Sequence, residues 1–216
     1  MSTLADMRTR ILDDLERDSA TWGTRIGQAV TDAITFYQPK RFYFNESRSV
    51  TFSTVIGTDL YTFNTPTLTG TVGAEFYKID EVLILQGGTW DILKKVDYDW
   101  LEDMADNNVS QGQPYNWAYV GRQMRFYPNP NAIFTVRVIG HQKFTAPADD
   151  AVNDNVWMNE GFELIRSRAK KVFAMHVIED MDLASRMDQM ERSALTALRE
   201  ATYRKTEGGM IVPTQF

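Results

Sequence analysis

Apolar residues recur at helical spacing over the first forty positions. The series that starts at Leu4 repeats every three or four residues, with acidic residues and arginines between its members. Such spacing places apolar side chains on one face of an α-helix. A second series starts at Trp22 and stops before Pro39, a residue that cannot continue a helix. We predict two amphipathic helices, over residues 3–18 and 22–37, that form a hairpin with their apolar stripes facing each other or a sheet.

Beyond position 40 the pattern changes to an alternation of period two, which is typical of strands. Gly and Pro residues separate the alternating runs. The Asp97 carboxylate is placed to cap one short helix among them, residues 97–104. The predicted strands cover residues 50–55, 60–63, 76–86, 90–96, 115–120, 123–127 and 132–143.

Turn residues indicate how these strands pair. We predict hairpins about residues 57–59, about Gly87-Gly88 and about Gly121-Arg122, the last with a type II′ turn because its first central residue is Gly. Pro128-Asn129-Pro130 should block further pairing. Apolar residues occupy both faces of the strand at 132–143, which favours a central position in the sheet.

Two further apolar series of helical period follow, one from Trp157 to Val177 and one from Leu183 to Leu198. The acidic residues 179–182 between them are compatible with one bent helix or with two helices. The fold class that this order predicts is α+β. Terminal helices form a helical bundle, a central antiparallel sheet or sandwich lies between them, and an extended C-terminal tail follows. The corresponding domains are a helical domain (1–40 and 155–206), a β-rich domain (41–154) and the tail (207–216).

Composition removes several classes of function. The chain has no Cys and a net charge of −6, which excludes thiolate metal sites and disfavours nucleic-acid binding through Lys and Arg. The N-terminus is too charged for a signal peptide, and no apolar run reaches the eighteen residues of a membrane span.

Catalytic and metal-binding motifs are also missing from the sequence. His141 and His176 lie far apart and neither belongs to an HxxxH or HExxH pattern. We therefore predict no enzyme activity, no metal and no cofactor. The densest basic group, at positions 166, 168, 170 and 171, spreads around its helix. We interpret it as a solvated face or as ion pairs with a neighbouring subunit.

The order of elements, more than any one motif, resembles the head–tail adaptor (connector) proteins of tailed bacteriophages, including the tubular adaptors of short-tailed phages. The resemblance covers about 160 residues of the chain. The matching features are LxxMRxxIL in the first helix, AITFYQPKRFYFNESRSVTFST from Ala33, the turn at residues 57–61, Pro114-Tyr115, Tyr119-x-Gly121, Phe126-Tyr127-Pro128-x-Pro130 and Trp157.

This resemblance implies a non-catalytic virion protein at the head–tail junction, assembled in the host cytoplasm. It implies a homo-oligomeric ring of about twelve copies between the portal protein and a tail or nozzle protein. Genomic DNA would pass through the channel without specific binding, because an acidic lumen does not hold DNA. C-terminal segments of such proteins often reach the portal. The residues expected to dock there are Met210, Ile211, Val212 and Phe216.

An alternative reading of the same residues is a β-sandwich binding module, for glycan or protein, on a tail or cell surface. This alternative predicts that aromatic side chains such as Trp90, Trp100 or Trp117 are exposed and line a groove.

Overall fold

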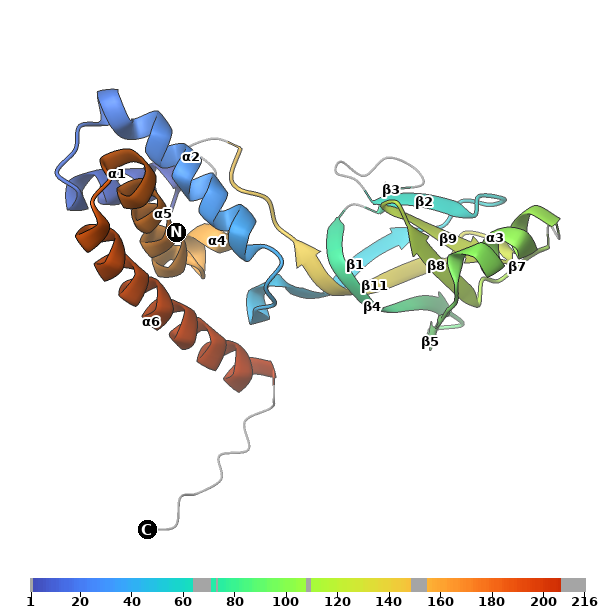
Figure 1. Ribbon diagram of the computed structural model, residues 1–216. Helices are drawn as coiled ribbons and strands as arrows, with labels where there is room; N and C mark the ends of the chain where they lie inside the picture. The colour runs from blue at the N-terminus through green and yellow to red at the C-terminus, as the bar shows by residue number, and fades with distance from the viewer. Residues whose placement is uncertain (1, 64–70, 73, 108–109, 149–154, 207–216) are drawn as a thin grey trace, which may run out of the picture. The chain divides into compact units, whose positions relative to one another are not determined.

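The computed structural model (Figure 1) describes residues 2–63, 71–72, 74–107, 110–148 and 155–206. The chain divides into two compact units. Met1–Asn45 and Phe144–Phe216 make up the helical unit, and Glu46–Lys143 makes up the β-rich unit. The fold is α+β, with helices at both ends of the chain and mainly antiparallel sheets between them, as the sequence predicts.

Two helices open the helical unit, and side-chain caps fix where they begin. α1 (Leu4–Asp14) starts with a capping box between Thr3 and Asp6. α2 (Ser19–Tyr37) starts at Asp18, whose carboxylate accepts a hydrogen bond from the Thr21 amide. The first helix ends before residue 18 because Glu16 adopts a left-handed backbone conformation, with φ of 53°.

The C-terminal helices are separate. α4 (Val156–Asn159) and α5 (Phe162–Phe173) lead into a π-helical turn, η2 (Ala174–Ile178), and α6 (Met181–Thr206) follows. Glu179 ends the π-helical turn with a left-handed φ of 60°. Of the two possibilities that the sequence left open, the structure therefore shows two helices.

One apolar core holds the helical unit together. Met7 and Ile11 of α1, Ile34 of α2 and Ile165 of α5 are completely buried in it. Trp157 is also fully buried, and its indole Nε1 donates a hydrogen bond to the Phe144 carbonyl at 2.9 Å. Figure 1 shows α5 between α2 and α6, both of which it contacts.

The β-rich unit is a sandwich of two sheets. Sheet A has the order β1 (Glu46–Ser53), β11 (Thr135–Lys143), β4 (Glu75–Gln86), β5 (Thr89–Ile92). Sheet B has the order β3 (Thr71–Val72), β2 (Leu60–Phe63), β9 (Gln123–Tyr127), β8 (Asn116–Val120), β6 (Lys94–Lys95). Side chains from both sheets, among them Val136 of sheet A and Trp117 of sheet B, form one buried core.

Four further elements lie outside the two sheets and the main helices. A 3₁₀ turn, η1 (Tyr43–Asn45), comes immediately before β1, and α3 (Tyr98–Asn107) packs on β8 and β9. β7 (Gln111–Gly112) pairs in parallel with β10 (Asn129–Pro130). We predicted that Pro128-Asn129-Pro130 blocks further pairing. This prediction is wrong for Asn129 and Pro130, which pair with Gln111 and Gly112.

Hairpin predictions succeeded where the paired strands are neighbours in the sequence. β4–β5 and β8–β9 form hairpins as predicted, and β11 is central between β1 and β4. The predicted strand at 90–96 is divided, because only Thr89–Ile92 pairs with β4, whereas Lys94–Lys95 (β6) pairs with β8 in sheet B. The predicted hairpin about residues 57–59 is wrong. β1 pairs with β11 in sheet A and β2 pairs with β9 in sheet B, because the chain crosses from one sheet to the other between them.

The turn between β8 and β9 is of type I′ and not the predicted type II′. Both central residues have positive φ, 54° at Gly121 and 67° at Arg122, which defines type I′. Arg122 is thus a non-glycine residue in the left-handed region, and its place in the turn determines where its side chain lies.

Candidate functional site

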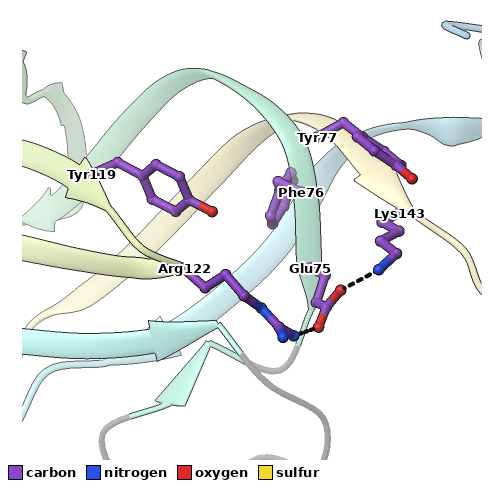
Figure 2. Close-up of a pocket in the computed structure, with 6 residues that line it drawn as sticks. All are labelled: Glu75, Phe76, Tyr77, Tyr119, Arg122 and Lys143. Atoms are coloured by element: carbon purple, nitrogen blue, oxygen red, sulfur yellow. Dashed lines mark hydrogen bonds and ion pairs between the residues drawn. The ribbon is translucent and has the colours of Figure 1, made fainter. Parts of the chain in front are cut away.

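A hollow of about 210 Å³ opens at one end of the β-rich unit, around the Glu75 carboxylate (Figure 2). Glu75 forms ion pairs with Arg122 and with Lys143, the latter at 3.0 Å between Nζ and Oε2. Phe76, Tyr77 and Tyr119 supply the aromatic part of the lining. The hollow therefore combines one carboxylate and its two cationic partners with aromatic rings.

Two strands and one turn of the sandwich bring the three charged residues together. Glu75 begins β4, Lys143 ends β11, and Arg122 sits in the β8–β9 turn. The backbone of the turn is held by the Phe63 amide, which donates to the Arg122 carbonyl at 2.9 Å. The buried Phe63 ring packs against Tyr119, with ring centroids 5.4 Å apart, and so supports the floor of the hollow.

The charged side chains of this hollow pair with one another. Its carboxylate already has two cationic partners, and no histidine, serine or threonine lines the described wall. Tyr77 and Tyr119 remain partly exposed and could pack against a protein side chain.

A second polar cluster joins three helices of the helical unit. Glu191 of α6 is buried and accepts hydrogen bonds from Tyr37 Oη at 2.5 Å, Lys171 Nζ at 2.9 Å and Arg168 Nη1 at 3.2 Å. Burial alone would raise the pKa of Glu191, but the bonds from Tyr37 and Lys171 and the nearby cationic charges lower it overall. Burial and the same carboxylate raise the pKa of Tyr37.

The basic group of α5 takes part in ion pairs within the chain. Arg166 and Lys170 contact Asp14 of α1 at 2.5 and 3.0 Å. Arg168 and Lys171 contact α6 as described above. Our interpretation of this group as a solvated face or as inter-subunit ion pairs is therefore wrong. It connects α5 to α1 and α6 of the same chain.

The remaining residues that the sequence singled out belong to neither charge cluster. His141 is buried in β11 beside Tyr77, and His176 lies in the π-helical turn. Trp117 is 1% exposed in the sandwich core, so the prediction that it lines an open groove is wrong. The predicted docking residues Met210, Ile211, Val212 and Phe216 lie outside the described residues.

The described ranges contain neither a metal-binding cluster nor a membrane-spanning helix. Within them, no three His, Cys, Asp or Glu side chains come together in a way that could hold a metal ion. No helix in the described part of the chain is long and apolar enough to cross a membrane.

Comparison with known proteins identifies the family. A family model, described as the SU10 adaptor protein, matches residues 2–212. The chain belongs to this family. SU10 adaptor proteins are phage head–tail adaptors, so the resemblance seen in the sequence is confirmed and the chain has a structural adaptor role in a phage. No curated protein matches the chain.

The β8–β9 turn could be predicted from the sequence, but the polar clusters around Glu75 and Glu191 could not. Glu75 and Lys143 are 68 residues apart, and Tyr37 and Glu191 are 154 apart. No local pattern marks such pairs, because they form only when the sheet and the helix packing are complete.

Proposed function

We propose that this SU10 adaptor protein is a non-catalytic ring component at the head–tail junction of the virion. About twelve copies would form the ring, joining the portal protein on one side to a tail or nozzle protein on the other. Genomic DNA would pass through the channel without specific binding. The family match over residues 2–212 carries this proposal.

Two features of the described residues support a binding role. The carboxylates of Glu75 and Glu191 are each paired with two cationic side chains of the same chain, as expected of a scaffold. The β-rich unit also keeps large apolar side chains exposed, including Trp100, Tyr115 and Ile133. Exposed apolar groups of this size are typical of surfaces that contact other proteins.

Portal docking by Met210, Ile211, Val212 and Phe216 is part of the proposal. These residues form an apolar, β-prone sequence that follows Gly208-Gly209. A segment of this composition can add to a partner as an extended strand or plug. α6, which comes before it, carries its own contacts to the helical core, so the segment is not needed to close that core.

Deletion of residues 207–216 tests the docking proposal. The truncated chain should keep the urea midpoint of the full chain, since the described core remains intact. It should lose binding to the purified portal protein in a pull-down, and phage carrying it should yield heads without tails. A variant with Met210, Ile211, Val212 and Phe216 changed to Ser should behave like the deletion.

The matched control changes Thr214→Ser and Gln215→Asn in the same segment and should bind the portal normally. Normal portal binding by the deletion would refute docking through this segment. A full chain that stayed a single protomer in the presence of both portal and tail proteins would refute the ring itself.

A further inference from the structure

The outer face of sheet A carries apolar side chains that the sandwich core does not use. Val82, Ile84, Val136 and Val138 point inward and are fully buried. Side chains alternate along a strand, so their neighbours point outward. We call the apolar outward residues, together with Arg137, the sheet A patch: Leu83, Leu85, Trp90, Ile92, Arg137 and Ile139. Glu81, opposite Ile139, also points outward and is exposed at the edge of the patch.

Register places the members of the sheet A patch side by side. Leu83 lies between Arg137 of β11 and Ile92 of β5, and Leu85 pairs with Trp90. Ile92 is 67% exposed, and the others are half-buried. The patch is therefore a continuous, mostly apolar surface on three neighbouring strands, larger than the isolated apolar side chains that are common on protein surfaces.

Arg137 gives this patch an unsatisfied positive charge. Its guanidinium carbon lies 3.9 Å from the centroid of the Trp90 ring, a cation–π contact. Its Nε is buried without a hydrogen-bond partner, and it forms no ion pair with any residue that the structure describes. A cation in this position would gain from a carboxylate brought by a partner.

The opposite face of the same unit carries the complementary chemistry. α3 lies on sheet B, where Leu101 and Ala105 bury its inner side. Its sequence, YDWLEDMADN, contains four acidic residues and no basic one. Trp100 is 46% exposed among these acids, and Arg125 of β9 holds Glu102 and Asp106. α3, which Figure 1 shows beside β8 and β9, is thus an anchored acidic helix. It carries an exposed aromatic ring, that of Trp100.

We propose that the sheet A patch of one copy binds α3 of the next copy. This inference rests on the proposed ring, and it specifies one interface within it. The Trp100 ring would pack among the aliphatic side chains of the patch, and the acidic residues of α3 would pair with Arg137. The partner is a second copy of this chain, chosen by charge complementarity.

Symmetry and charge favour this arrangement over a pair of identical faces. Two sheet A patches facing each other would bring two Arg137 side chains together with only one carboxylate each, Glu81 at the patch edge, whereas α3 offers four acidic residues. The patch and α3 lie on opposite faces of one sandwich, so each copy can contact one neighbour through each face. Such a heterologous contact repeats from copy to copy and generates a ring when the rotation closes.

Engineered cysteines give a direct test, because the natural chain contains none. In the full chain carrying both Ile92→Cys and Asp103→Cys, oxidation should produce a ladder of covalent oligomers. Each single variant alone should give no ladder, and an equimolar mixture of the two should stop at dimers. The control pair, Tyr203→Cys with Asp103→Cys, uses an exposed residue of α6 and should give no ladder.

Charge reversal gives a second test that does not depend on cross-linking. Arg137→Glu should raise the protein concentration needed for half-assembly about tenfold or more. Asp99→Lys with Asp103→Lys should do the same, and it spares the two acids that Arg125 holds. Combining both changes in one chain should restore much of the assembly. The control Arg204→Glu, at a side chain 80% exposed on α6, should leave assembly unchanged.

The outcomes separate this interface from the ring itself. Rings without a ladder above the control level would overturn the interface and leave the ring proposal standing. A covalent dimer from Ile92→Cys alone would also overturn it, because it would show two patches face to face. A wild-type chain that stays a single protomer even with portal protein would overturn both.

Discussion

Glu191 is the residue on which the packing of α6 most depends. Its side chain is 7% exposed and receives three hydrogen bonds from α2 and α5. A buried carboxylate is tolerated only when its charge is compensated and its oxygens are bonded. Here the compensation comes from two other helices, so this one residue fixes how α6 sits on them.

Replacing Glu191 with Gln should destabilise the chain strongly. The variant keeps the shape of the side chain but leaves Arg168 and Lys171 without their common counter-charge. The expected loss in the free energy of unfolding is roughly 3 kcal/mol, measured by urea denaturation. The control is Glu200→Gln on the same helix, where an exposed ion pair to Arg204 should contribute within about 0.5 kcal/mol. Equal effects at the two sites would refute the role of burial.

The same carboxylate predicts a pH dependence. The pKa of Glu191 in the folded state lies below its ordinary value of 4.5. A group whose pKa is lowered by folding stabilises the protein above the unfolded pKa and loses this contribution as pH falls through the folded pKa. The stability difference between wild type and Glu191→Gln should therefore be constant from pH 7 to about 5 and shrink below pH 4.5. A difference that stayed constant down to pH 2.5 would contradict the assignment.

At the scale of elements, replacing a glycine by alanine should destabilise the chain at Gly140 and stabilise it at Gly27. A Cβ at Gly140 would lie 2.2 Å from the Lys78 carbonyl oxygen, where β11 passes β4 at a register shift. Gly140→Ala should therefore separate the two strands and lower the free energy of unfolding by roughly 2–3 kcal/mol.

A Cβ at Gly27 of α2 would meet only the Arg8 side chain, at an ordinary 3.6 Å. Gly27→Ala should stabilise the chain by about 0.5–1 kcal/mol. Thermal unfolding of both variants checks the signs.

Elements formed by neighbouring residues could be predicted, and elements formed by distant ones could not. The β8–β9 hairpin follows from a Gly-centred turn between alternating runs. The turn type was wrong because Arg122, unlike most non-glycine residues, adopts positive φ. β1 and β2 are neighbours in the sequence but do not pair with each other. β1 pairs with β11, and β2 pairs with β9 as well as with the short β3; β11 and β9 are more than sixty residues away. Alternation of apolar and polar residues indicates a strand but does not identify the strand with which it pairs.

Local features of the candidate sites could likewise be predicted, whereas features that depend on distant residues could not. The outward position of Arg137 and Ile139 on one strand could be read from alternation, and the acidic character of α3 from composition. Their placement on opposite faces of one sandwich depends on the order of strands in the two sheets. No local sequence pattern specifies that order. The Glu75 and Glu191 clusters required packing between distant segments and left no sequence signal.

At the scale of the whole molecule, the separate cores predict separate folding. The helical unit and the β-rich unit each bury their own apolar cluster. The ends of the β-rich unit are adjacent, since Glu46 pairs with His141 and Ser47 with Gly140. An insertion with adjacent ends can be removed without stretching the chain that remains.

We therefore expect residues 46–143 to fold alone, and residues 1–45 joined to 144–206 by a short Gly/Ser linker to fold as well. Each piece should show its own cooperative urea transition. Gly140→Ala should shift the midpoint of the first piece, and Glu191→Gln that of the second. A piece that lacked a cooperative transition would show that its core needs the other unit, and the two units would then be one folding domain.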